Sequence, residues 1–364
     1  MKLQINHIDQ FKSLLRNKKE IKLKKEMVDG KEVGIISYAI EKDDTFNTSI
    51  SRECRGIVFD MKTGECICRP YHKFFNVNQK AETQIDKIDW NGISYIGTKH
   101  DGSLLMPVLI NDKIFWKTKK SFYSEVAIKA TKVWNEKYKG SVFEHNMTLD
   151  LKAGLTPLFE FVDKEVPIVI KNNESDFILL ALRNIKTGEY KFFKHHEDLK
   201  QKFNSLADFV NEVKDKEDIE GYVISDGENI YKVKTQWYLE RHRMLSKYTI
   251  NSILDLYIND VIDDFIAELY TFNYVEKAKM IEKFRDEFTN WILNIEEVAQ
   301  NKLEELKKKH KRTELRIQIA QMTNSALMFN LLDGKDVTMF LKKKMRDHFK
   351  DVYKNKIFFM GEEL

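Results

Sequence analysis

Lys99 stands where a run of strand-forming residues is interrupted by polar ones. The segment 95–105 reads YIGTKHDGSLL, in which apolar residues lead into Lys99 and the polar residues 100–103 before apolar residues resume. A lysine at the end of a strand is usually a solvated charge, and an Asp-Gly pair is an ordinary turn signal. A lysine amine can also act as a nucleophile when its surroundings favour the uncharged form. The neighbours of Lys99 decide between these two interpretations.

Four more charged residues lie in segments that otherwise read as strands. They are Glu160 in TPLFEFV, Glu220 at the start of EGYVIS, and Lys232 and Lys234 in YKVKT. Side chains alternate along a strand, so Lys232 and Lys234 share one face. Each charge alone is consistent with an exposed position. The combination indicates a single cleft around Lys99.

Such a cleft would suit phosphate chemistry. Nearby ammonium groups would disfavour the protonated form of Lys99 and free its lone pair for attack. The same cations would neutralise phosphate oxygens during phosphoryl transfer. Glu220 could hold a divalent metal ion through water, and Glu160 could accept hydrogen bonds from a ribose. These residue types therefore predict a lysine that attacks a nucleotide phosphate.

Short strands must position these side chains. Before residue 235, β-branched and aromatic runs alternate with turn signals, and we expect hairpins at 111–113, 185–190 and 225–229. The pattern predicts an α+β domain over residues 1–238, dominated by antiparallel strands. The expected strands are 34–40, 55–60, 93–98, 104–110, 113–119, 156–162, 177–183, 220–225 and 230–235.

The chain changes character near residue 235. All four prolines precede this point, and only Gly334 and Gly361 follow it. So few helix breakers, together with helical periodicity as in SILDLYINDVIDDFIAELY (252–270), predict helices. We therefore expect residues 239–364 to form an all-helical C-terminal domain.

The overall composition limits the class of protein. With 42% hydrophobic and 32% charged residues, the chain is globular and not disordered. Its 61 basic and 57 acidic residues give a net charge of +4, so local patches would have to hold an anionic partner. The three cysteines (Cys54, Cys66 and Cys68) speak against a disulfide framework, and the N-terminus has no apolar run typical of a signal peptide. We expect a cytoplasmic protein with no membrane partner.

The charged segments, taken together, resemble the motifs of the covalent nucleotidyltransferases, the superfamily of ATP-dependent ligases and mRNA capping enzymes. The K-x-D-G signature of that superfamily is similar to KHDG at 99–102. Four later segments follow in the order of the superfamily: FEFV (159–162), LLALRN (179–184), EGYVI (220–224) and KVK (232–234).

Further segments narrow the resemblance to the T-even phage type of RNA ligase 1. These segments are ECRGIVF (53–59), RPYHKFFNVN (69–78), WKTKKS (116–121) and KTQWY (234–238). The sequence departs from the family at His100, where acidic residues are common, and at Lys120, where glycine is frequent. The resemblance implies a nucleotidyltransferase domain followed by helices, in place of the β-rich OB domain that follows the last motif in DNA ligases and capping enzymes.

The resemblance also implies catalytic roles. Lys99 would be the nucleophile that becomes adenylated by ATP. Lys232 and Lys234 would contact the α phosphate, and Glu220 would bind a metal-bound water.

Further residues would bind the nucleotide and metal. Arg55 and Lys73 would engage the β and γ phosphates, Lys119 the phosphates or ribose, and Glu160 the ribose. The implied cofactors are ATP and Mg²⁺ or Mn²⁺. Asp263 and Asp264 could bind a second cation, or could simply favour the start of a helix.

The implied activity is that of an ATP-dependent RNA ligase. It would join RNA 5′-phosphate and 3′-hydroxyl ends through lysyl-AMP and adenylated RNA, in RNA repair such as the sealing of a tRNA loop. We expect a monomer that acts on single-stranded or tRNA-loop ends, in the host cytoplasm if a phage encodes it. Basic helix faces at 302–316 and 340–354 could contact the RNA backbone or remain solvated surface.

Two other functions fit part of the pattern. The first is another polynucleotide ligase or nucleotidyltransferase, which would act on nicked duplex or on a different 5′ end. The second is a non-catalytic RNA-binding protein that uses the cleft only for electrostatic capture, with salt-sensitive binding and no covalent adenylate.

Overall fold

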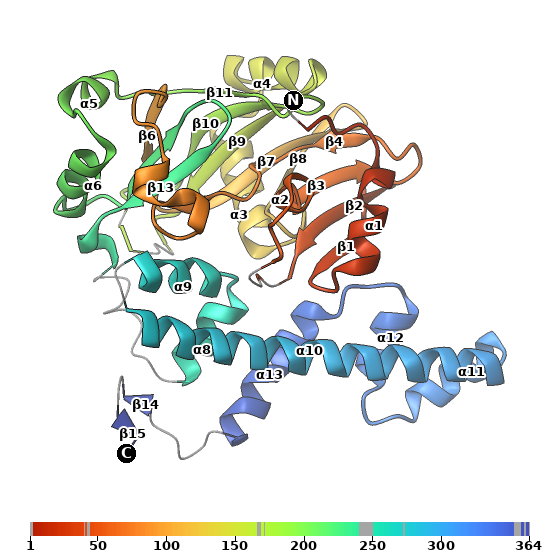
Figure 1. Ribbon diagram of the computed structural model, residues 1–364. Helices are drawn as coiled ribbons and strands as arrows, with labels where there is room; N and C mark the ends of the chain where they lie inside the picture. The colour runs from red at the N-terminus through yellow and green to blue at the C-terminus, as the bar shows by residue number, and fades with distance from the viewer. Residues whose placement is uncertain are drawn as a thin grey trace. The chain divides into compact units, whose positions relative to one another are not determined.

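The computed structural model describes the chain with short gaps. The described residues are 3–39, 41, 44–165, 169–170, 172–239, 250–271, 274–352, 358–359 and 362–363. The chain divides into two compact units, residues 1–243 and 244–364 (Figure 1). The ends of two predicted segments, residue 40 and residues 353–354, lie outside the described residues.

Over the described residues, the first unit has three sheets. One has the order β1-β2-β3-β4, with β1 (Ile21–Val28), β2 (Lys31–Tyr38), β3 (Arg55–Asp60) and β4 (Cys66–Cys68). The next has the order β11-β10-β9-β7-β8, with β7 (Ser103–Ile110), β8 (Lys113–Lys117), β9 (Leu155–Val162), β10 (Asp176–Asn184) and β11 (Tyr190–Phe192). The third has the order β5-β13-β12-β6, with β5 (Phe75–Asn76), β6 (Tyr95–Lys99), β12 (Gly221–Ser225) and β13 (Ile230–Lys234). Among these described strands, β5 and β13 are parallel and the other pairs are antiparallel.

Short helices connect and cover the sheets. They are η1 (Ile8–Phe11), α1 (Lys12–Asn17), α2 (Ser49–Arg52), η2 (Ala81–Thr83), η3 (Ile85–Lys87), α3 (Glu125–Lys137), α4 (Val142–Lys152), α5 (Glu197–Lys202) and α6 (Leu206–Lys214). Ser124 and Ser141 cap α3 and α4, since each side chain accepts a backbone N–H of the first turn. The two helices bury Trp134 and Met147 in one cluster with Phe159 of β9, which fixes them against the second sheet.

The predicted α+β class is confirmed. Each predicted strand segment overlaps an observed strand, and the predicted hairpin at 111–113 is a tight turn in which Asn111 and Asp112 have φ values of 49° and 59°. Positive φ at both central residues is the geometry that asparagine and aspartate tolerate best among residues with a side chain. The sequence analysis missed β1, because its segment IKLKKEMV carries four charged residues.

Helices build the second unit. They are α8 (Ile250–Ile258), α9 (Ile262–Thr271), α10 (Val275–Lys309), α11 (Arg312–Ala320), α12 (Ser325–Leu332) and α13 (Thr338–Val352). The predicted helical run 252–270 is broken at Asp260, which has a φ of 61°. Asp260 Oδ1 forms an ion pair with Nζ of the buried Lys342 at 2.7 Å. One short pair, β14 (Phe358–Phe359) and β15 (Glu362–Glu363), departs from the all-helical expectation. Within the described ranges, no helix combines the length and the apolar character that a membrane span requires.

Candidate active site

The KHDG loop joins two sheets of the first unit. Lys99 ends β6 in the third sheet, and Ser103 begins β7 in the second. Lys99 lies opposite Gly221 of β12, and Gly221 lies opposite Lys234 of β13. Glu220 directly precedes β12 and therefore lies between the two lysines. Its Oε1 is 2.6 Å from Lys99 Nζ and 3.1 Å from Lys234 Nζ.

Gly221 makes this arrangement possible. Its φ of 148° lies in a region that residues with a side chain rarely adopt, and a Cβ atom there would lie 2.0 Å from the carbonyl oxygen of Val233. Glycine thus lets β12 and β13 pair closely at the point where Glu220 turns toward the lysines.

Lys232 adds a third lysine on the same face of this sheet. It lies two residues before Lys234 in β13, is 7% exposed, and is opposite Asn76 of β5. Its Nζ is 5.2 Å from the centre of the Phe74 ring, and the Arg55 guanidinium carbon is 5.5 Å from the same ring. The predicted phosphate ligands Lys232 and Arg55 therefore meet at one aromatic side chain.

Two more predicted phosphate ligands, Lys73 and Lys119, meet at a second ring. Lys73 is buried, with its Nζ 2.5 Å from Glu41 Oε2 and 5.5 Å from the centre of the Tyr38 ring. Lys119 Nζ is 4.3 Å from the centre of the same ring. The Glu41 carboxylate balances the charge of Lys73.

The two carboxyl groups of the site have opposite pKa shifts. Burial alone would raise the pKa of Glu220, but the charges of Lys99 and Lys234 hold it below its ordinary value. Burial raises the pKa of Glu160 to about 8, against the attraction of Lys99 and with a contribution from the negative charge of Glu220. Glu220 is therefore ionised at neutral pH, whereas Glu160 is mostly protonated and can donate as well as accept a hydrogen bond.

Asp101 fixes the loop that carries the nucleophile candidate. Its Oδ2 accepts hydrogen bonds from the backbone N–H groups of Val169 and Ile170, both at 2.7 Å, and its Oδ1 accepts one from the Tyr238 hydroxyl at 2.8 Å. A Cβ at Gly102 would lie 2.4 Å from a carbonyl oxygen of β9. The Asp-Gly pair thus ties the Lys99 loop to the KTQWY segment and to the second sheet.

Burial lowers the pKa of two side chains near the departures from the family pattern: His100, which is itself a departure, and Lys117, three residues before Lys120. Burial, with the nearby charge of Lys194, lowers the pKa of His100 to about 4, so the imidazole is neutral. Burial also lowers the pKa of Lys117 to about 8, and its ammonium donates to the backbone oxygens of Gly56 at 3.0 Å and Thr118 at 2.6 Å. Lys117 therefore links β8 to β3.

The sequence analysis missed a buried ionic cluster beside the site. Glu53 lies between the guanidinium groups of Arg69 and Arg183, which contact its two oxygens at 2.7 to 3.2 Å. Burial would raise the pKa of Glu53, but the two guanidinium groups lower it to about 2. The three residues come from three different motif segments, and no local pattern shows that they meet.

The predicted second cation site lies in the other unit. Asp263 and Asp264 occupy the first turn of α9, and Asp263 Oδ1 is 3.4 Å from a guanidinium nitrogen of Arg285. Over the residues that the structure describes, no three His, Cys, Asp or Glu side chains are grouped as metal ligands. The metal role of Asp263 and Asp264 stays a prediction, while their place in the first turn fits the helix-start interpretation.

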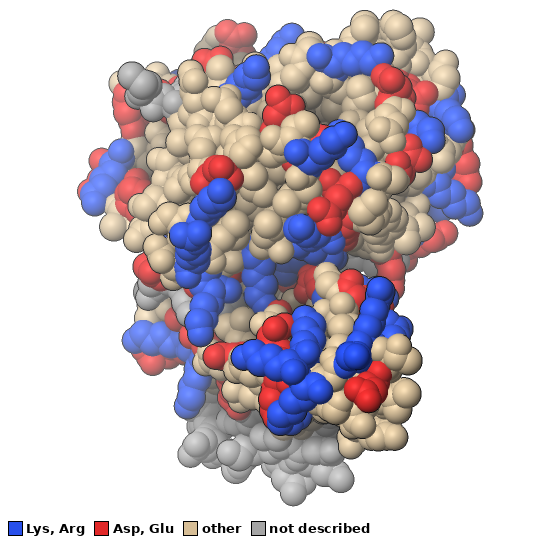
Figure 2. Space-filling view, turned by 90° about the vertical axis from the view of Figure 1, so that its right-hand side faces the viewer, with Lys and Arg blue, Asp and Glu red and all other residues tan. Residues whose placement is uncertain are grey.

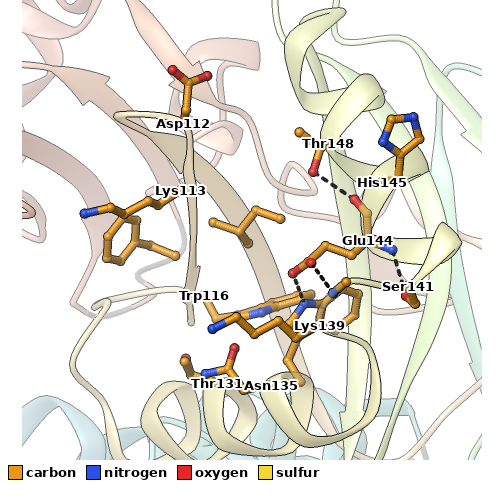
Figure 3. Close-up of a pocket in the computed structure, with 14 residues that line it drawn as sticks. Asp112, Lys113, Trp116, Thr131, Asn135, Lys139, Ser141, Glu144, His145 and Thr148 are labelled. Carbon is orange, nitrogen blue, oxygen red and sulfur yellow. Dashed lines mark hydrogen bonds between the residues drawn. The ribbon is translucent and has the colours of Figure 1, made fainter.

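A hollow of about 590 Å³ lies away from these residues, between β8, α3 and α4 (Figure 3). Figure 3 shows Glu144 beside Trp116 and Lys139, with both carboxylate oxygens in hydrogen bonds. Glu144 accepts from the Trp134 indole at 3.0 Å and from the backbone N–H of Gly140 at 2.7 Å, which joins α3 to α4. None of the site residues predicted from the sequence lines this hollow.

Comparisons with known proteins identify the family of the chain. A family model described as RNA ligase matches residues 53–238. The chain belongs to the RNA ligase family. The matched region contains every predicted site residue of the first unit: Arg55, Lys73, Lys99, Lys119, Glu160, Glu220, Lys232 and Lys234.

Two relatives have sequences similar to this chain over much of its length. A protein of Thermovibrio ammonificans assigned as an RNA ligase is 25% identical over 283 residues, which cover 73% of each chain. RNA ligase 1 of bacteriophage TS2126 is 27% identical over 257 residues, or 66% of this chain and 64% of the phage protein. A solved RNA ligase of Naegleria gruberi, a mutant with AMP and manganese, has a TM-score of 0.36 and 15% identity, covering 66% of this chain and 84% of its own. The family assignment rests on the sequence matches.

Proposed function

We propose that this chain is an ATP-dependent RNA ligase that joins a 5′-phosphate to a 3′-hydroxyl. The observation that carries the proposal is the ionised Glu220 between Lys99 and Lys234, with Lys232 on the same face of the sheet. A nucleophile candidate beside a carboxylate and two further lysines suits attack on a phosphate. In this proposal, residues 1–238 carry the nucleotidyl transfer and residues 239–364 contribute to the choice of RNA.

The first step would adenylate Lys99. Its uncharged amine attacks the α phosphorus of ATP, a P–N bond forms, and the bond to pyrophosphate breaks. Glu220 Oε1, 2.6 Å from Nζ, is placed to orient the amine and to take the proton that it loses. Lys232 and Lys234 would neutralise the oxygens of the α phosphate.

The next two steps would use the same groups. The RNA 5′-phosphate attacks the lysyl-AMP, which breaks the P–N bond and leaves AMP on the RNA end. A 3′-hydroxyl then attacks the activated phosphate, and AMP leaves. Each displacement needs in-line geometry and neutralised charge, and Lys232 and Lys234 would neutralise the phosphate at which the displacement occurs. Arg55, Lys73 and Lys119 would act in the first step, on the triphosphate of ATP.

The site residues fit a divalent cation. Because its pKa lies below the ordinary value, Glu220 is an anionic oxygen ligand of the kind that Mg²⁺ or Mn²⁺ binds through water. Such an ion would offset the charge of the leaving pyrophosphate. Asp263 and Asp264 remain the candidates for a second ion.

The helical unit offers a basic surface for RNA. Figure 2 shows Lys and Arg gathered in the lower part of the view, where the end of α10 and α11 face the reader. Lys302, Lys307 and Lys309 pair with glutamates of the same helix. Lysines on such a surface would bind RNA phosphates in a salt-dependent way. In the proposal the partner is a single-stranded or tRNA-loop RNA end, met by a monomer in the cytoplasm during RNA repair.

A joining assay tests this function. Single-stranded RNA with a 5′-phosphate and a 3′-hydroxyl is incubated with ATP and Mg²⁺ beside a nicked DNA duplex, using wild type and Lys99→Arg. We expect wild type to join the RNA and Lys99→Arg to fail, since a guanidinium stays protonated and is a poor nucleophile. Preferential sealing of nicked DNA would favour another polynucleotide ligase. Salt-sensitive RNA binding without joining would favour the non-catalytic alternative.

A further inference from the structure

Asn76 is a buried residue whose side-chain oxygen has no hydrogen-bond partner. It lies in β5, is 4% exposed, and its Oδ1 is buried and unpaired. Its backbone groups are satisfied, since the N–H donates to Gln79 Oε1 at 2.9 Å and the carbonyl accepts from the Thr83 hydroxyl at 2.9 Å. The local turn therefore uses the backbone of Asn76 and leaves its carboxamide oxygen unused.

Such atoms are rare in this chain. Within the described residues, three buried side-chain nitrogen or oxygen atoms lack a partner: Arg55 Nε, Asn76 Oδ1 and Trp116 Nε1. Burying a polar group without a hydrogen bond destabilises the folded state, so each case calls for an explanation. Two of the three atoms belong to residues close to Lys232: Asn76 lies opposite it in the sheet, and Arg55 contacts the same Phe74 ring.

The strand register places Asn76 in that site. Asn76 of β5 lies opposite Lys232 in the parallel pair with β13, so the two side chains share one face of the sheet. Lys232 lies over the Phe74 ring, and so does Arg55 with its unpaired Nε. Asn76 and Lys232 thus lie on neighbouring strands of one sheet, and Arg55 of β3 lies over the same Phe74 ring as Lys232.

We propose that the Asn76 carboxamide is a nucleotide-binding group that contacts the phosphate chain of ATP beside Lys232. This inference rests on the proposed function. The charges of Lys232 and Arg55 attract an anion, and a phosphate oxygen accepts hydrogen bonds. The NH₂ group of the same carboxamide can donate to such an oxygen. Arg55, which contacts the same Phe74 ring as Lys232, has a second donor without a partner, its Nε–H.

A purely structural role of Asn76 and a ligand-binding role predict different effects of replacing it. If Asn76 served the fold alone, replacing it would lower stability and ATP binding together. If it serves the ligand, an apolar residue of the same shape removes an unsatisfied buried group, and the ligand-free protein becomes no less stable. Leucine branches at the same carbon as asparagine and carries no polar atom, so Asn76→Leu separates the two roles.

The experiment compares wild type, Asn76→Leu, Asn76→Asp and the control Asn135→Leu, which makes the same exchange at an exposed residue of α3. Bound AMP is first removed with pyrophosphate. Titration calorimetry then measures the affinity for α,β-methylene-ATP, which cannot be cleaved at the reacting bond, and circular dichroism measures the melting temperature without ligand. Formation of Lys99–AMP from ATP is followed separately.

We expect Asn76→Leu to bind the analogue about 10-fold to 100-fold more weakly, as for the loss of a hydrogen bond to a charged group, with an unchanged or higher melting temperature. Asn76→Asp should bind still more weakly, because it places a carboxylate next to the phosphates. Asn135→Leu should match wild type. Wild-type affinity in Asn76→Leu, or parallel losses of affinity and melting temperature in both Asn76 variants, would overturn the inference while leaving the ligase proposal intact. Failure of wild type itself to bind the analogue and form Lys99–AMP would overturn both.

Discussion

Glu53 and Glu220 are two buried carboxylates that each lie between two cations, yet their surroundings differ. Glu53 contacts the guanidinium groups of Arg69 and Arg183, whose remaining donors bind backbone carbonyls such as those of Leu3, Lys186 and Gly188. Glu220 contacts the ammonium groups of Lys99 and Lys234, and the Lys99 side chain is 22% exposed.

The difference lies in the chemistry of the cations. An arginine keeps its charge and holds a carboxylate with a rigid planar group, so the Glu53 cluster keeps its ion pairs. A lysine can lose its proton and carries its amine on a flexible stem. The Glu220 cluster can therefore release an amine to a ligand, while the Glu53 cluster holds together the motif segments that surround the site.

The largest expected effect is on the free energy of unfolding, which should depend more on Glu53 than on Glu220. Glu53→Gln leaves two buried guanidinium groups without their counter-charge, and we expect the first unit to lose about 3–5 kcal/mol of unfolding free energy. Chemical denaturation followed by circular dichroism measures this loss.

Glu220→Gln is the matched control for that comparison. It should lose less than half as much stability, because lysines can deprotonate and Lys99 can turn toward solvent, but it should adenylate far more slowly than wild type. The comparison fails if Glu53→Gln is as stable as Glu220→Gln, or if Glu220→Gln adenylates at the wild-type rate.

A smaller effect concerns the dependence of stability on pH. The pKa of Glu160 is about 8 in the folded protein, above its ordinary value of 4.5, so the folded state holds a proton that the unfolded state has lost between these pH values. This contribution to stability is therefore complete below pH 4.5 and is lost as the pH rises to 8. Because the pKa of Glu53 is lowered to about 2, its contribution has the opposite sign and is lost only as the pH falls below 4.5.

Melting temperatures of wild type and Glu160→Gln, measured from pH 5 to pH 8.5, test this assignment. The wild-type value should fall over this range relative to that of Glu160→Gln, whose neutral amide does not titrate. Identical slopes for the two proteins would show that Glu160 does not hold the proton.

The sequence predicted the parts of the fold that local patterns determine. Alternating strand residues and turn residues such as Asn111 and Asp112 gave the hairpins, and the absence of proline after Pro167 indicated the helices. The sequence analysis did not predict the break in the helical run at Asp260, where the structure shows a positive φ and an ion pair with Lys342, 82 positions further along the chain.

The site shows the same division. Lys99, Glu220 and Lys234 were found from their residue types in strand segments, and the structure brings them together. Asn76 and Glu53 were not found, because burial without a partner and a contact with Arg183, 130 positions further along the chain, are properties of the packed chain. Local sequence patterns carry no signal for either property.

One measurement tests the central claim that the lysine cluster performs the chemistry. The protein, freed of bound AMP, is incubated with Mg²⁺ and ATP labelled on the α phosphate, without RNA, and the labelled peptide is mapped after denaturing electrophoresis. We predict label on Lys99 in wild type and none in Lys99→Arg. Absence of label in a wild-type protein that still binds ATP, or label on another residue, would contradict the claim.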